Sequence, residues 1–171
     1  MKRKIFSVLT ALSAAILITS TVFAGAIKLS RVTFSLGSLV ANGKITGLGN
    51  QDVIVHLDAS GFPLVTCTNQ GGNQAPGQNP PKVSAGGQQA LLGDDPSKTF
   101  GKYLFGVETE NPTELDAVEY GCPNDNWTAS IDFVFWDEAT ISIKDLDGNE
   151  LLTQDYTCTT TLTNVSCTPV K

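Results

Sequence analysis

The sequence predicts an all-β protein, an antiparallel immunoglobulin-like β-sandwich stapled by disulfides. Short segments in which every second residue is apolar recur along the chain, Gly, Asn, Asp and Pro clusters separate them, and no segment has a convincing helical period. A small barrel or a jelly roll is the alternative, because both show the same pattern. Since the segments alternate and are not continuously apolar, each sheet is expected to have one solvent-facing side.

The first 24 residues have the pattern of a secretory signal peptide. Three basic residues, Lys2, Arg3 and Lys4, precede an apolar run over residues 5–18. Small residues offer cleavage after Ala24 or Ala26. The apolar run is short for a membrane span of about 20 residues. We therefore expect export, an extracellular location, and a single domain over residues 25–171.

The charge balance narrows the range of partners. The first 24 residues hold three of the 11 basic residues and none of the 17 acidic ones, so the rest of the chain has a formal net charge of −9. Such a surface repels phosphate backbones and anionic membranes. We therefore expect no nucleic-acid partner, and no membrane partner once the signal is removed.

Strand-like alternation begins at residues 32–36 and returns at residues 53–59 and 64–68. Asn-Gly at residues 42–43 and the glycines of residues 47–50 predict turns between the first two segments. The first half of the chain therefore predicts strands joined by short turns.

The second half continues the pattern. Residues 127–135 carry apolar side chains at every odd position, which is the clearest strand of the chain. Asp147-Gly148 predicts a two-residue hairpin turn. Residues 113–120 are the one segment for which the pattern allows a helical turn, with an irregular extended loop as the alternative. The other strand-like segments are residues 83–92, 103–107, 141–143 and 152–158.

Residues 67–81 form the longest segment without a strand period. They hold three Gly, three Pro and three Asn and no charge, a composition that excludes a helix or a central strand. We expect an ordered loop at one end of the sandwich. Its amides and those of a second loop are candidate recognition residues: Asn69, Gln70, Asn73, Gln74, Gln78, Asn79, Asn124 and Asn126.

Four cysteines, Cys67, Cys122, Cys158 and Cys167, predict two disulfides in an oxidising compartment. We favour Cys67–Cys122, because both residues border turn-rich stretches, together with Cys158–Cys167, which would close a terminal hairpin. Pairing of Cys67 with Cys158 and of Cys122 with Cys167 is the main alternative. The spacing of the cysteines and the single histidine do not fit a zinc site.

Three sequence strings resemble those of a group of small exported bacterial proteins, mostly hypothetical, from actinomycetes and other soil bacteria. The strings are GLGN at residues 47–50, CTNQGGNQAPGQNP at residues 67–80 and GCPNDNWT at residues 121–128. The resemblance covers roughly residues 45–160 and implies export and an all-β fold. It implies no activity.

Trp136 is a candidate aromatic contact, because it alternates out of phase with Phe133 and Phe135 and lies beside two acidic residues. An exposed indole near carboxylates can stack on a sugar ring. The alternative is that Trp136 covers the second sheet face or an edge. Trp127 is expected in the core.

We expect no cofactor and no metal site, with Asp145 and Asp147 as weak calcium candidates. These aspartates begin like a calcium loop, but no glutamate follows at the position that ends one. A hairpin turn explains them more simply. His56, the sole histidine, is expected to be a solvated strand residue, because no nucleophile-elbow motif accompanies it.

These observations favour a secreted, non-catalytic binding or structural protein whose extracellular partner is unknown, a cell-wall polymer or a protein being the candidates. A secreted carbohydrate-active or other hydrolase using scattered carboxylates is one alternative. Neighbouring acidic residues on one strand are expected to point to opposite faces and so not to act together. A calcium-stabilised adhesion-type module is the other alternative.

Overall fold

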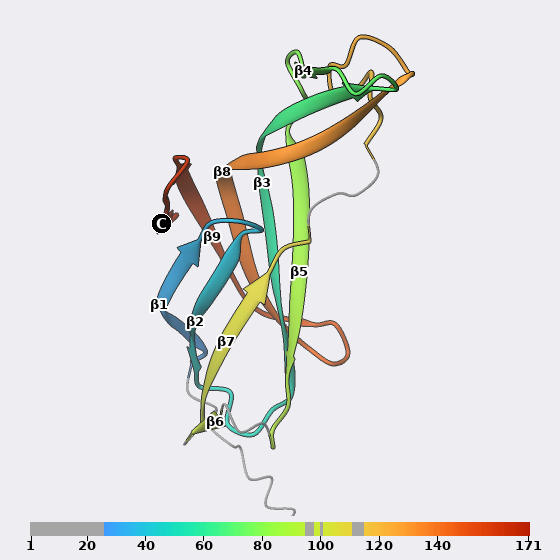
Figure 1. The fold of residues 1–171 in the computed structure, drawn as a ribbon. Helices are drawn as coiled ribbons and strands as arrows, with labels where there is room; N and C mark the ends of the chain where they lie inside the picture. Colours follow the sequence, from blue (N-terminus) through green and yellow to red (C-terminus); the bar gives the residue numbers. More distant parts are fainter. Residues whose placement is uncertain (1–25, 95–97, 100, 111–114) are drawn as a thin grey trace, which may run out of the picture.

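The computed structural model describes residues 26–94, 98–99, 101–110 and 115–171 (Figure 1), so the expected signal peptide lies outside the described residues. No helix in this part of the chain is long and apolar enough to cross a membrane. Its strands are β1 (Lys28–Ser35), β2 (Val40–Thr46), β3 (Val53–Asn69), β4 (Gln74–Pro76), β5 (Val83–Leu91), β6 (Lys98–Thr99), β7 (Lys102–Glu108), β8 (Trp127–Asp145), β9 (Glu150–Thr160) and β10 (Val165–Pro169).

Two antiparallel sheets confirm the predicted immunoglobulin-like sandwich. The first sheet has the order β1-β2-β7-β6, and the second has the order β10-β9-β8-β3, with both β4 and β5 on the far side of β3. The strand orders of the two sheets match the A-B-E-D and G-F-C-C′ orders of immunoglobulin domains. β10 is an additional strand beyond the G position.

The core lies between the sheets and is built by the period-2 alternation of the strands. β7 alternates buried Tyr103, Phe105 and Val107 with exposed residues. β3 alternates buried Val53, Val55 and Leu57 with half-buried residues, and β8 adds the fully buried Ile141 and Ile143. Each sheet of the body therefore has one apolar and one solvent-facing side, as the alternation predicts.

Strands β5 and β7 close one side of the sandwich. Glu110 N–H donates to the carbonyl of Gly86 (2.9 Å), and the Gln89 side chain accepts from Gly106 N–H (2.9 Å). A Cβ on Gly87 would collide with the backbone of Glu108. Gly87 is thus the residue that lets the two sheets approach at this edge.

Strands β3 and β8 are longer than the sandwich that they belong to. β5 pairs with β3 only from Val53 to Gly61, and β9 pairs with β8 only from Glu138 onward. Beyond these points the two strands continue as a bent ribbon that projects from the body (Figure 1). The bend coincides with register shifts at Ser60/Gly61 and Leu64/Val65.

Of two local expectations, one is refined and the other is corrected. Residues 115–121 form turns, in which one bond, from Tyr120 N–H to the Asp116 carbonyl, has the spacing of a helical turn; residues 113–114 lie outside the described residues. The β8–β9 connection is longer than two residues: residues 146–149 separate the strands, with Gly148 at φ 86°. Asp145 folds this longer turn by bonding Asn149.

Replacing Gly87 by Ala is expected to destabilise the fold by about 2–4 kcal/mol, because backbone of β7 must move. Urea unfolding measures the effect. Gly106→Ala is the matched control, because its Cβ meets only the end of the flexible Asn42 side chain. Equal stability of the two variants would contradict a close β5–β7 contact.

Candidate functional site

The ribbon beyond the sandwich, residues 62–69 of β3 and 127–135 of β8, is here called the arm. β4 pairs with its end at residues 66–68 of β3. The turn after β3 and the segment before β8 meet at the end of the arm, and together they are called the tip. Residues 67–81 and 122–126, which the sequence singles out, therefore lie at one end of the molecule (Figure 1).

The predicted disulfides are both present. Cys67 joins Cys122, and Cys158 joins Cys167 across the β9–β10 hairpin. Cys67 and Cys122 are buried with Val65 in a small cluster of their own, against which Trp127 and Ile131 pack. The arm therefore has a separate apolar core, and the disulfide ties the segment before β8 to β3.

The turn after β3 is ordered by Asn69. Its Oδ1 accepts from Gly71 N–H and Asn73 N–H, both at 2.9 Å, and its carbonyl accepts from Gly72 N–H. Gly72 has a φ of 79°, a conformation that an L side chain rarely adopts. This Asn-Gly-Gly chemistry closes the turn and returns the chain to β4.

The second half of the loop is packed on the arm. Gly77 N–H donates to the Val65 carbonyl (2.8 Å) and Gln78 N–H to the Gly121 carbonyl (3.0 Å). A Cβ on Gly121, whose φ is 80°, would collide with the Gln78 backbone. The loop is thus ordered and fixed, as expected from the sequence.

A shallow depression of about 390 Å³ lies at the tip. Its lining residues, Asn69, Gln70, Gly71, Asn124, Asn126 and Trp127, come from both sides of the tip. Asn124 forms a second turn, because its Oδ1 accepts from Asn126 N–H (3.0 Å) and its carbonyl accepts from Trp127 N–H. The tip depression is therefore lined by four amide residues, one glycine and one tryptophan.

The structure brings together four of the eight candidate amides: Asn69, Gln70, Asn124 and Asn126. Gln74 lines a different hollow, beside Leu64 and Asp132. Asn73, Gln78 and Asn79 are exposed but line neither hollow. Gln78 donates to the Pro76 carbonyl, and Asn79 has a φ of 49°.

The expected roles of the two tryptophans are corrected. Trp136 is 1% exposed in the sandwich core, so it is no surface contact; its indole N–H has no hydrogen-bond partner among the described residues. Trp127 is half-buried and lines the tip depression. Trp136 points into the core between the two sheets because it lies near the bend, where the sandwich still covers that side of β8.

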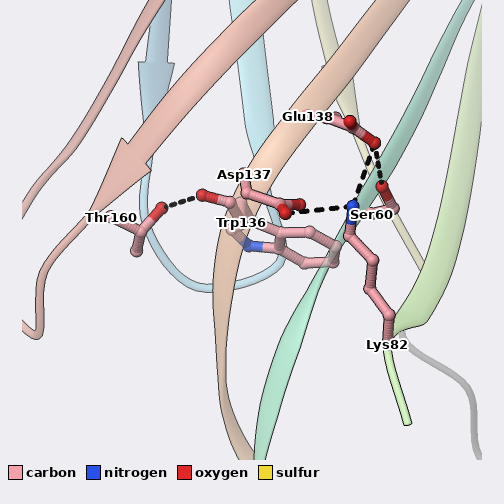
Figure 2. Close-up of polar contacts among 6 residues, drawn as sticks. All are labelled: Ser60, Lys82, Trp136, Asp137, Glu138 and Thr160. Carbon is pink, nitrogen blue, oxygen red and sulfur yellow. Dashed lines mark hydrogen bonds and ion pairs between the residues drawn. The ribbon is translucent and has the colours of Figure 1, made fainter.

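A polar cluster holds the root of the arm (Figure 2). Lys82 Nζ lies 3.0 Å from Asp137 Oδ2 and 3.0 Å from Glu138 Oε2, and Ser60 donates to Glu138 Oε2 at 3.1 Å. The Thr160 hydroxyl donates to the Trp136 carbonyl (2.7 Å), next to the last β9 pairing. The cluster therefore ties the start of β5 to the bend of β8.

Asp137 and Glu138 reach the same ammonium group although they are neighbours in sequence. Ser60 pairs with Glu138 and Gly61 with Trp136, so Asp137 is the extra residue of a bulge. This corrects the expectation that adjacent carboxylates on one strand point apart. Hydrogen bonds from Lys82 and Ser60 lower the pKa of Glu138, and those with Asp137 and Glu138 raise the pKa of Lys82.

An exposed apolar strip on the arm was not expected from the sequence. Phe62 pairs with Phe135 and Leu64 with Phe133, and Phe62 and Leu64 are 56% and 47% exposed. The Phe133 and Phe135 rings meet edge-to-face at 4.9 Å, and Lys82 Nζ lies 5.7 Å from the Phe62 ring. The sequence does contain a pattern that predicts this strip: residues 61–65 are apolar on both faces of the strand, whereas only one face can meet the core.

Carboxylates gather on the outer face of the second sheet. Asp58 and Glu138 line one open depression, and His56, Asp58, Glu108 and Glu110 line another. His56 is half-buried and faces outward. No group of three or more metal-ligating residues occurs within the described ranges. Hydrogen bonds from Asn149 lower the pKa of Asp145, whose two oxygens hold the β8–β9 turn, and Asp147 is exposed.

Replacing Lys82 by Met is expected to speed backbone hydrogen exchange at the root of the arm, near residues 60–64 and 134–138. The lowered pKa of Glu138 means that its stabilising effect is present above its ordinary pKa and is lost as the pH falls through the lowered value. The raised pKa of Lys82 means that its effect is lost as the pH rises through the raised value.

The difference between wild type and Lys82→Met is therefore expected to be present between about pH 5 and pH 10 and to shrink at both ends. Lys144→Met, which removes an equal charge at the far end of β8, is the control. Unchanged exchange at the root in Lys82→Met would contradict the role of the cluster.

Removing the Cys67–Cys122 bond with paired Ala substitutions is expected to cost about 4 kcal/mol of stability. Removing Cys158–Cys167 the same way should cost about 3 kcal/mol, because it closes a shorter loop. The sequence separations are 55 and 9 residues. Denaturant unfolding of both variants measures the two losses of stability. A larger loss on removing Cys158–Cys167 would contradict the prediction.

Comparison with protein-family models, with curated proteins and with solved structures finds no match to this chain. The function of the chain is therefore inferred from the geometry of the arm and of the two sheets.

Proposed function

We propose that the chain is an exported, non-catalytic binding protein that holds a neutral polysaccharide of a cell envelope at the tip of its arm. The observation that carries this proposal is the tip depression, which four amide residues line together with the half-buried Trp127. An indole face stacks on the apolar face of a sugar ring, and amides both donate to and accept from hydroxyl groups.

The chemistry of the lining favours an uncharged ligand. None of the six lining residues is ionisable, although the chain as a whole carries a formal net charge of −6. A charged ligand would find no partner of opposite sign inside the depression. A sugar polymer needs none, since its hydroxyls are satisfied by neutral donors and acceptors.

The tip is fixed before any ligand arrives. The Oδ1 atoms of Asn69 and Asn124 hold turns, and the Cys67–Cys122 bond joins the two sides of the tip. A site whose parts are already in place loses less conformational entropy on binding. Gln70 and Asn126 are exposed, and their side chains make no hydrogen bond in the described part of the chain, so their amides remain for a ligand.

Export is part of the proposal. Two disulfides are consistent with an oxidising compartment. The residue pattern of the first 24 positions is that of a secretory signal. A binding protein for envelope polymers acts in the same compartment.

The two alternatives have less support. A glycosidase needs a general acid with a raised pKa, whereas hydrogen bonds lower the pKa of Glu138, one of the two carboxylates beside the first acidic depression. A calcium-stabilised module would need the aspartates after β8, and both oxygens of Asp145 already accept bonds from Asn149.

Replacing Gln70 and Asn126 together by Ala is expected to weaken binding to insoluble envelope polysaccharide at least about tenfold, because two hydrogen bonds of about 1 kcal/mol each are lost. A sedimentation assay measures the bound fraction. Quenching of tryptophan fluorescence by soluble fragments gives a second readout, since Trp127 is half-exposed and Trp136 is buried.

The matched control is Gln51→Ala with Asn42→Ala, an exposed Gln and an exposed Asn away from the arm. Both double variants should unfold at the wild-type denaturant concentration. Equal binding by wild type and by Gln70→Ala/Asn126→Ala would overturn the proposal, as would failure of the wild type to bind any envelope polysaccharide.

A further inference from the structure

The outer faces of the two sheets carry opposite charge. β1 and β2 contain Lys28, Arg31 and Lys44 and no acidic residue, and β7 adds Lys102 at one end and the acidic Glu108 at the other. On the outer face of the second sheet, β3, β8 and β9 present Asp58, Glu138 and Asp155, together with the basic Lys144 at the end of β8. A chain of formal net charge −6 thus keeps one basic face.

The charged residues of the two faces have the same geometry. On the basic face, Lys28 pairs with Thr46, and Thr46 pairs with Lys102. On the acidic face, Asp58 pairs with Thr140, and Thr140 pairs with Asp155. In both faces a threonine on the middle strand separates two like charges by two strand spacings, about 10 Å.

The next row along each sheet extends the match. Two residues along the middle strand from Thr46 lies Lys44, between Ser30 and Leu104. Two residues along from Thr140 lies Glu138, between Ser60 and Thr157. Each face therefore presents a triangle of three charged side chains, with a base of about 10 Å and a height of about 7 Å. Glu138 is also held by Lys82, whose Nζ lies 3.0 Å from its Oε2, so Asp58 and Asp155 are the acidic charges of the triangle outside that ion pair. Each triangle is mirror-symmetric about its middle strand. The three charges of one face can therefore lie opposite the three charges of the other when the two faces are turned toward each other.

The surface relief is complementary as well. Leu104, beside Lys44, is 61% exposed and stands out from the basic face. The acidic face is hollowed beside Glu138 by a depression of about 360 Å³ that Ala59, Ala85 and Ala139 help to line. The Thr140 hydroxyl donates to Asp155 Oδ1 (2.8 Å), which fixes one corner of the acidic triangle.

We propose that the basic face of one copy binds the acidic face of a second copy, so that exported molecules associate head to tail. Because the contact joins two different surfaces, it propagates into an open chain and does not close into a dimer. This inference is independent of the sugar-binding proposal, since none of its residues lies on the arm tip. A second copy accounts for both triangles, whereas an anionic polymer would account only for the basic one.

The contact is expected to be weak and salt-sensitive. A stable interface buries at least about 1,200 Å² in total, or about 600 Å² on each partner. A face of three strands of about seven residues is smaller than that share. Exposed charge pairs are screened within about 10 Å at 0.1 M salt. Association is therefore expected at high protein concentration and low ionic strength.

Sedimentation velocity of the full chain, expressed with export so that both disulfides form, tests the proposal. Wild type is expected to show a sedimentation coefficient that rises with concentration in 50 mM NaCl and not in 500 mM NaCl. Lys28→Glu/Lys102→Glu and Asp58→Lys/Asp155→Lys are each expected to lose association at least about tenfold, because like charges then face one another. An equimolar mixture of these two variants should associate again.

The matched control replaces Gln70, Gln74 and Gln78 by Glu and Asn73 by Asp; it changes the net charge by the same four units on exposed residues at the end of the arm, away from both faces, and should associate like wild type. Circular dichroism verifies folding of each variant. A monomeric wild type at 50 mM NaCl, or a mixture that stays monomeric, would overturn the proposal. Monomeric wild type that binds alginate through Lys28 and Lys102 would instead assign the face to an anionic polymer.

Discussion

The pairing of β3 with β8 is the interaction on which the rest of the structure depends. The pairing extends along both strands, from Val53 opposite Asp145 to Asn69 opposite Trp127, with two register shifts on the way. Its first half is the centre of the second sheet, and its second half is the arm. A slip of one residue would turn the buried side chains of the slipped half outward. Because two one-residue register shifts lie between the body and the end of the arm, each half is held in register by its own buried side chains.

The arm lacks a second layer and is stabilised at its two ends instead. A two-stranded ribbon is marginal in water by itself. At the tip, Cys67, Cys122 and Val65 form a small core with a disulfide in it. At the root, Lys82 holds the bulge of β8 through two carboxylates. The apolar strip of Phe62 and Leu64 remains exposed because no sheet extends far enough to cover it.

Alternation and turn signals were sufficient to predict the strands and the sandwich, because both depend on local pattern. The turn-rich stretches beside the cysteines favoured, without settling, the disulfide pairing that the structure shows. It was insufficient where both faces of a strand are apolar. Trp136 and Phe135 are neighbours of similar character, and only the position of the bend decides that Trp136 is buried. The joint contact of Asp137 and Glu138 with Lys82 depends on a bulge, and a bulge leaves no periodic signal. The tip amides were predicted as a group, yet contacts across the tip select four of them.

The two proposed surfaces place different demands on the same fold. Recognition of a sugar needs fixed donors and acceptors, and the tip supplies them with turns and a disulfide. Association of copies needs broad faces with complementary charge, and the flat outer sides of the two sheets supply those. Because the arm projects beyond the body, as Figure 1 shows, copies can pack through their bodies while each tip stays exposed. Weak contacts between bodies would then present many tips together, so that binding to a repeating polymer gains from multivalency without any stronger single site.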